Sequence, residues 1–184
     1  MPSQDYAGRM NARIPFTLCA AALIAASPGM TQEQAAFEQL PGFELAFQTE
    51  DDGEFIREYL QPGDTVDDWR EMQTHQRFPS WAGGNPIQFL RLLAGQLQEA
   101  CPEVGFRVTN ATVAGGYPNA AIYGRCLNPQ AEWFVIVAIS GDEALHVVQH
   151  SWRIEPAQAA FAARLEALTS VPLCRAARSP VECP

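Results

Sequence analysis

The chain has 184 residues, of which 47% are hydrophobic and 18% are charged, a composition typical of a folded globular protein and not of a disordered one. This length suits one domain with its own hydrophobic core. The formal net charge of −9 argues against nucleic acid or an anionic membrane surface as a partner, because binding to either needs a basic surface.

Residues 1–29 have the pattern of a secretory signal peptide. Arg9 and Arg13 precede the apolar run IPFTLCAAALIAAS, which is too short to span a bilayer. Small residues after this run suit cleavage before Met30. We therefore expect a periplasmic or secreted protein with no transmembrane segment after cleavage.

Two alternatives at this end stay open in the sequence. Met10 is an alternative start, because the residues before it add nothing that a signal peptide needs. Cys19 raises the possibility of a lipoprotein, although the bulky Leu18 before it disfavours lipidation.

Removal of the signal peptide leaves an even set of cysteines. In an oxidising compartment this favours two disulfides, for which the sequence alone allows three connectivities. A local pair would close the Pro-bearing tail VPLCRAARSPVECP and leave the other two cysteines to each other, each bridge contributing roughly 2 to 4 kcal/mol. The two expected pairs are Cys174 with Cys183 and Cys101 with Cys126.

Residues 30–40 are expected to form an N-terminal arm, and residues 41–184 a single α+β domain with a disulfide-closed C-terminal tail. The domain begins with FELAFQTEDDGEFIREYL, which predicts a β-hairpin. We favour a loop of three residues, 51–53, over a loop of two, 52–53, because it gathers the large apolar side chains on one side. These side chains are Phe43, Leu45, Phe47, Phe55 and Tyr59.

The segment that follows, EYLQPGDTVDDWREM, holds a cluster of acids. It lacks the alternating oxygens and the central glycine of a calcium loop. We interpret it as the start of a short helix, in which Asp64 or Thr65 is the cap. Asp67 and Asp68 would then face the positive end of the helix dipole, with Trp69 on the buried side.

The next segments predict a strand, a loop and a helix. EMQTHQRF alternates as a strand does, and SWAGGNP is expected to be a loop. The helix PIQFLRLLAGQLQEAC begins behind the cap residue Asn85, with Pro86 in its first turn. Its apolar residues 87, 90, 93, 94 and 97 have the spacing of one buried stripe.

Four strands and a helix complete the domain: GFRVTNATV, NAAIYGRCL, AEWFVIVAIS, EALHVVQHSWRI and PAQAAFAARLEALTS. Gly141-Asp142 suits a type II′ turn between the last two strands. Both faces of this pair carry large apolar side chains, so we expect central strands covered on both sides. The order of elements predicts an antiparallel sheet packed with helices.

The segments YLQPGDTVDDWREMQTHQRF and CLNPQAEWFVIVAISGDEALHVVQHSW, together with this order of elements, resemble a group of small exported bacterial proteins of uncharacterised function. Their arrangement is similar to the α/β/α sandwich of the photosystem II extrinsic subunit PsbP. The resemblance covers residues 41–183. It implies a binding or assembly role and provides no catalytic residues.

The residues that could carry chemistry favour no metal site or catalytic centre. His146 and His150 are four apart on a predicted strand, ~13 Å, which is too far to share one zinc ion. With His75, we expect them to be partly exposed strand residues. There is no G-x-S-x-G motif, and the even cysteine count argues against a free catalytic thiol. No cofactor or metal is therefore expected.

Loop aromatic residues are the better functional candidates. Trp81 in SWAGGNP and Tyr117 in AGGYPNA would serve as binding residues, unless both rings tuck under their own loops. We expect a non-enzymatic binding or assembly protein of the cell envelope, whose partner is another protein or an envelope component. An inhibitor or immunity-type protein suits the negative charge. The alternative is an envelope hydrolase that uses carboxylates or a bound metal.

Overall fold

A computed structural model describes residues 33–37, 39–112, 116–128 and 130–174. All of them belong to one unit that spans residues 31–184. The predicted signal peptide and Cys183 lie outside the described residues. No helix in the described ranges has both the length and the hydropathy needed to cross a bilayer.

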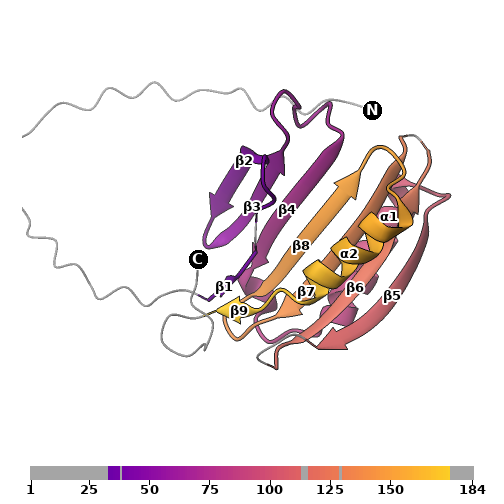
Figure 1. Cartoon of the computed structure of the whole chain (residues 1–184). Helices are drawn as coiled ribbons and strands as arrows, with labels where there is room; N and C mark the ends of the chain where they lie inside the picture. The colour runs from indigo at the N-terminus through magenta and orange to yellow at the C-terminus, as the bar shows by residue number, and fades with distance from the viewer. Residues whose placement is uncertain (1–32, 38, 113–115, 129, 175–184) are drawn as a thin grey trace, which may run out of the picture. The chain divides into compact units, whose positions relative to one another are not determined.

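A seven-stranded antiparallel sheet forms the centre of this unit, in the order β2-β3-β4-β8-β7-β6-β5 (Figure 1). With the helices described next, it confirms the predicted α+β class. The strands are β2 (Glu44–Asp51), β3 (Glu54–Leu60), β4 (Glu71–Phe78), β5 (Gly105–Thr112), β6 (Pro118–Cys126), β7 (Glu132–Ser140) and β8 (Leu145–Trp152).

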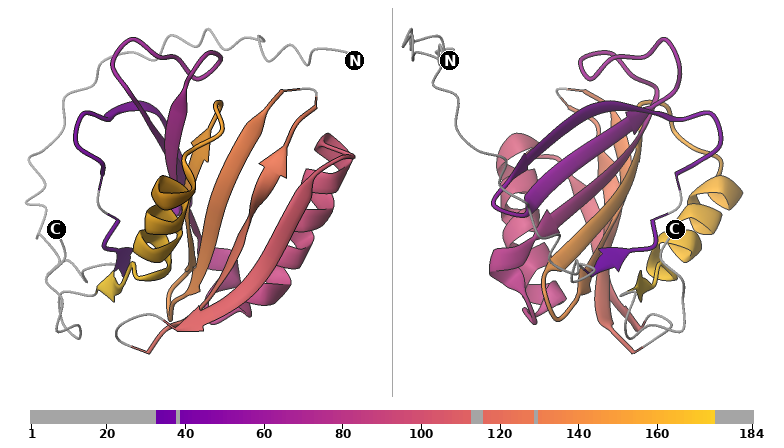
Figure 2. Two further views of the ribbon diagram at one scale, coloured as in Figure 1. Left: turned by 45° about the vertical axis from the view of Figure 1, so that its right-hand side comes forward. Right: turned by 90° about the vertical axis from the view of Figure 1, so that its left-hand side faces the viewer.

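One helix packs on each face of the sheet, as the views in Figure 2 show. We call these the α1 face and the α2 face. The specific likeness to PsbP stays a prediction. A second, two-stranded sheet, which the sequence did not predict, joins two segments far apart in the chain. The remaining elements are α1 (Pro86–Ala100), α2 (Gln158–Thr169), the 3-10 turn η1 (Pro79–Trp81), β1 (Gln34–Ala35) and β9 (Leu173–Cys174).

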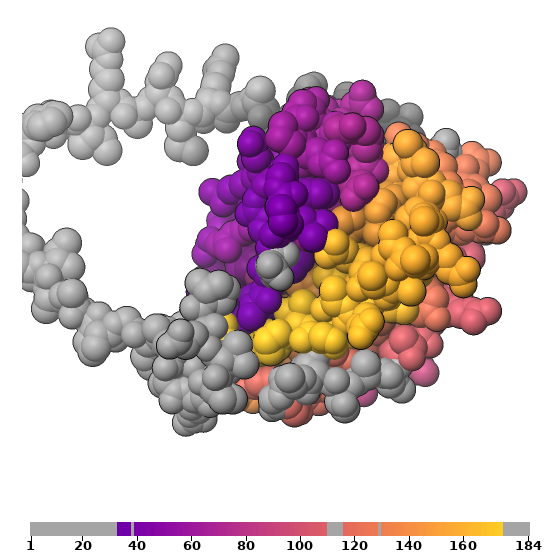
Figure 3. Space-filling view, viewed as in Figure 1, coloured from indigo at the N-terminus to yellow at the C-terminus, as the bar shows by residue number. Residues whose placement is uncertain are grey.

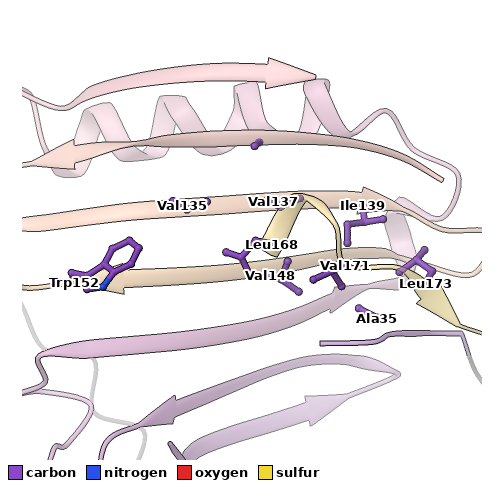
Figure 4. Close-up of a cluster of buried hydrophobic side chains, with 10 residues drawn as sticks. Ala35, Val135, Val137, Ile139, Val148, Trp152, Leu168, Val171 and Leu173 are labelled. Carbon is purple, nitrogen blue, oxygen red and sulfur yellow. The ribbon is translucent and has the colours of Figure 1, made fainter. Parts of the chain in front are cut away.

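The core lies on both sides of β7 and β8, as predicted for central strands. On the α1 face, Leu90 and Ala94 of the helix pack against alternate residues of β6, β7 and β8. On the α2 face, Leu168 and Leu173 meet the opposite side chains of β7 and β8, and Ala35 of β1 completes the cluster (Figure 4). Because β7 is apolar at nearly every position, it can be covered on both faces.

The first turn of α1 is capped as predicted. The Asn85 side chain accepts hydrogen bonds from the N–H groups of Ile87 and Gln88, at 2.9 and 3.3 Å. Pro86 occupies the first turn, where a missing N–H costs nothing.

Replacement of this cap gives a first testable expectation. Asn85→Ala leaves two N–H groups of α1 without their side-chain acceptor, and we expect it to lower the free energy of unfolding by about 1 kcal/mol. Asn85→Ser keeps an acceptor and should lose much less. Urea denaturation of both variants measures the difference, and equal stability of the two would show that the cap contributes nothing.

The β2–β3 hairpin differs from the prediction in its loop. Asp51 pairs with Glu54, so the loop has two residues. Asp52 and Gly53 both have positive φ, at 50° and 78°, as a type I′ turn requires. The prediction of three loop residues was wrong. A β-bulge between Leu45 and Phe47 supplies the shift in pairing register that the extra loop residue was meant to supply.

The acidic segment after the hairpin is a loop, so the predicted helix start was wrong. Too few residues separate the turn at Gly63 from the start of β4 to nucleate a helix. Side chains bond the backbone instead: Arg70 N–H donates to Asp64, and Asp68 N–H donates to the Thr65 hydroxyl. Trp69 points inward as expected and packs with other buried side chains. Its neighbours there are Leu60 and Met72.

The disulfide between Cys101 and Cys126 is present, with an S–S distance of 2.12 Å, and it ties the end of α1 to β6. Cys174 is also disulfide-bonded. Its predicted partner, Cys183, lies outside the described residues. A disulfide of this kind is compatible with an oxidising, extracytoplasmic compartment.

Candidate functional site

A groove on the α1 face is the candidate functional site. It consists of two adjoining hollows of about 580 and 320 Å³. Both are lined by Gln76, Phe78 and Ser80, so they form one continuous surface beside α1. We call this surface the α1 groove. It forms at the edge of α1, because this helix packs mainly on β6 and β7 and reaches β4 through the contact of Phe89 with Phe78.

The two ends of the α1 groove differ in chemistry. At the end near the β2–β3 turn, Asp51, Asp52 and Glu54 line it and are exposed. At the other end the wall is mainly apolar, with some glutamine side chains. Leu92 differs from the other apolar residues there because it is 58% exposed. An acidic end next to an apolar end is the complement of a basic segment with apolar side chains.

Trp81, one of the predicted binding residues, lines the apolar end of the α1 groove. Its ring is half-buried and packs edge-on against Phe89, with the ring centroids 5.3 Å apart. Tyr117 is half-buried and packs against the core on the opposite face. The fold therefore does not bring the two predicted residues together in one site.

Sequence reasoning missed most of the α1 groove. Leu92 looks like a surface exception on α1, and Gln76 like an ordinary polar position of a strand. Asp51 and Asp52 fall in the loop expected for the hairpin, where adjacent acids are usually only solvated. The one sequence signal for this site is Leu92, an apolar residue that lies outside the buried stripe of its helix.

The three histidines are not partly exposed, as expected from the sequence, but buried. Their exposed fractions are 7% for His75, 0% for His146 and 1% for His150. His75 pairs with Val148, which lies between the other two on β8, so the three rings gather on the α2 face. The rings of His75 and His146 are 5.8 Å apart.

Residues 33–37 and 39–43, which we call the N-terminal strap, cover this histidine cluster. Phe37 lies 5.4 Å from the His75 ring, and Phe43 lies 6.1 Å from the His150 ring. Figure 3 shows this indigo segment beside the yellow α2 segment on the same surface. The sequence suggested no such cover, because the strap has neither a strong period nor a turn motif.

Burial sets the protonation state of two of these histidines. Burial lowers the pKa of His75 to about 3, and the nearby His146 and Arg57 act in the same direction. Burial, together with Arg164, lowers the pKa of His150 to about 3. A carboxylate oxygen of Glu71 lies 3.3 Å from His150, but this acid is partly exposed and its attraction is the weaker effect. Both imidazoles are therefore neutral near pH 7.

Glu33 fastens the strap to the β7–β8 turn. Its carboxylate accepts hydrogen bonds from the N–H groups of Asp142 and Glu143, and its own N–H donates to the Glu143 carboxylate. Burial by itself raises the pKa of Glu33, but these backbone bonds and the nearby His146 outweigh it and lower the pKa. Glu33 is thus an ionised, buried side chain that holds two chain segments together.

Gly141 has a different role from the one predicted. The turn has no positive φ at Gly141 and runs from Gly141 to Ala144, so the type II′ assignment was wrong. A Cβ at this position would lie 1.8 Å from a Glu33 carboxylate oxygen. The glycine is required because the strap approaches the backbone this closely.

The histidine cluster is closed to solvent, so its side chains are better suited to packing in the core than to binding a ligand or to catalysis. Among the residues that the structure describes, no three His, Cys, Asp or Glu side chains are placed to hold a metal ion. Neither a scan against protein-family models nor a search of curated proteins gave a significant match. The functional assignment therefore rests on the surface of the molecule.

Proposed function

We propose that this is an exported binding protein of the bacterial cell envelope, which holds a basic, partly apolar segment of a partner protein in the α1 groove. The observation that carries the proposal is the pairing of exposed acids at one end of the groove with a mainly apolar hollow and the exposed Leu92 at the other. Neither feature alone would distinguish a binding site from an ordinary surface.

The charge of the whole chain supports the same partner. A formal net charge of −9 attracts a basic protein over a distance and speeds association, while the apolar end of the groove supplies contact area. Leu92 and Trp81 are the expected anchors there, because large side chains in a hollow dominate binding energy. An inhibitor or immunity-type protein directed at a basic enzyme fits this description.

Export is supported by the signal-like start of the chain and by the Cys101–Cys126 disulfide. The resemblance to small exported bacterial proteins points in the same direction and implies a binding or assembly role. The histidine cluster and its cover contribute stability to the domain and do not form part of the α1 groove.

The experiment is capture of partners from an envelope extract with variants that alter each end of the groove. Leu92→Glu places a charge in the apolar end without touching the core, and Asp52→Asn with Glu54→Gln removes two charges while keeping a turn residue that tolerates positive φ. We expect each change to weaken binding of the captured partner at least about tenfold, which corresponds to roughly 1.4 kcal/mol.

A matched control removes the same number of charges elsewhere. Glu103→Gln with Glu166→Gln changes two exposed acids outside the groove, and binding should be close to that of the wild type. The affinity should also fall as salt is added, because the acidic end acts through charge. A partner that binds all the variants equally well would rule out the α1 groove as its site.

A further inference from the structure

A second cleft lies on the α2 face, between the start of α2 and the edge strand β5. It measures about 770 Å³, which is within the range of small-molecule sites. Its floor is set by the register of three strands: Gly105 pairs with Arg125, which pairs with Trp133. We call this surface the arginine cleft.

The cleft is hollow because of a glycine. Gly105 has no side chain on this face, and a Cβ added there would meet nothing within 4 Å. Along the pairing register, the next two positions carry the long or aromatic side chains of Arg125 and Trp133. The space above Gly105 is thus an unfilled position at the edge-strand end of this row.

Aromatic rings form the apolar wall of the arginine cleft. Tyr123, Trp133 and Phe161 line it and are half-buried. Phe161 of α2 holds the wall in place, since its ring lies 5.9 Å from Tyr123 and 5.7 Å from Trp152. A flat apolar molecule could therefore lie against rings that the core already orients.

Two guanidinium groups stand beside this wall. Arg107 and Arg125 are diagonal neighbours on adjacent strands, with Cα atoms roughly 7–8 Å apart by sheet geometry. Both are exposed, and in the described part of the chain neither takes part in an ion pair. Glu155 is the one acid among the described lining residues. In a chain of net charge −9, the cleft is a local reversal of sign.

We propose that the arginine cleft binds a small aromatic acid, with its ring against Trp133 and its anionic group on Arg107 and Arg125. Guanidinium groups bind carboxylates in a bidentate manner and also stack on flat rings, so both parts of such a ligand are matched. The site is independent of the α1 groove, which lies on the other face of the sheet and attracts the opposite charge.

The test uses the fluorescent aromatic anion 8-anilinonaphthalene-1-sulfonate and its neutral analogue N-phenyl-1-naphthylamine. We expect saturable binding of the anion to the folded protein and at least tenfold weaker binding of the analogue. Gly105→Phe places a ring in the hollow from a Cβ that meets nothing within 4 Å, and Arg107→Gln with Arg125→Gln removes the charge. Each should weaken binding of the anion at least tenfold, and 2-naphthoate should displace it from the wild type.

Three comparisons make the result decisive. Gly105→Phe should melt no lower than the wild type, so that lost binding cannot be attributed to unfolding. Arg91→Gln on α1 and Leu92→Glu in the α1 groove should leave binding unchanged. The proposal is overturned if Gly105→Phe binds the anion as well as the wild type does, if both probes bind equally, or if Leu92→Glu abolishes the signal.

Discussion

The free energy of unfolding is expected to fall as the pH is lowered from about 6.5 towards 4.5, by up to about 1.4 kcal/mol per pH unit for each of His75 and His150. Both histidines titrate near 6.5 when unfolded, and their pKa in the folded protein is about 3. The unfolded chain therefore binds more protons than the folded one throughout this range. The contribution of these two histidines to the free energy of unfolding is at its full value above pH 6.5 and is lost on acidification.

Two other groups in the described part of the chain have a shifted pKa, and neither imitates this effect in the same range. Glu33 has a lowered pKa, so its contribution is lost only below about 4.5. Burial raises the pKa of Glu58, which acts in the opposite sense, because its protonation favours the folded state. The interval between pH 6.5 and 4.5 thus reports mainly on the histidine cluster.

The control is His75→Gln, which keeps a polar side chain but removes its titration. Urea denaturation at several pH values should give a shallower dependence for this variant, by up to about 1.4 kcal/mol per pH unit, whatever the substitution costs at pH 7. His150→Gln should act likewise, to a smaller extent if Glu71 stabilises protonated His150. Parallel curves for the wild type and both variants would show that these rings are accessible to protons in the folded protein.

Gly141→Ala is expected to destabilise the protein by about 3 kcal/mol, although it adds only one methyl group. The new Cβ would lie 1.8 Å from a Glu33 oxygen and 2.8 Å from the carbonyl oxygen of Ala144. Glu33 must leave its place, and the N–H groups of Asp142 and Glu143 then lose their acceptor. The strap above the histidine cluster is released with it.

A double-mutant cycle with Glu33→Ala separates this cause from a turn effect. Once the carboxylate is gone, Gly141→Ala should cost clearly less than in the wild type, because the two nearest contacts, both with Glu33, are removed and the contact with the Ala144 carbonyl oxygen stays. The free energies of unfolding of the wild type, the two single variants and the double variant give the coupling. Additive costs would mean that the glycine serves the turn and not the strap.

The sequence predicted the elements of the domain well because most of them have strong local patterns. The cap at Asn85 and the stripe along α1 were both found, and β7 and β8 are central strands as expected. Prediction failed where the local structure depends on one residue more or fewer in a strand or a loop. The bulge after Leu45 and the short loop before β4 are such cases, since neither leaves a periodic signal.

The full extent of the surfaces proposed for binding could not have been predicted, because each is formed by strands and helices distant in the sequence. Trp81 was chosen as a loop aromatic residue, yet its place in the α1 groove depends on how far α1 extends over the sheet. The arginine cleft depends on register, which puts Gly105 opposite Arg125. The histidines were misjudged because nothing in their own strand indicates the strap that covers them.

The small β1–β9 sheet limits the order in which the domain can fold during its synthesis. Gln34 pairs with Cys174, so the first described strand has no partner until almost the entire domain has been synthesised. At about 5–20 residues per second, β1 is made roughly 7 to 28 seconds before its partner strand. Because β9 follows β8 in the chain, the small sheet can hold the strap over the histidines only after every strand of the large sheet has been made.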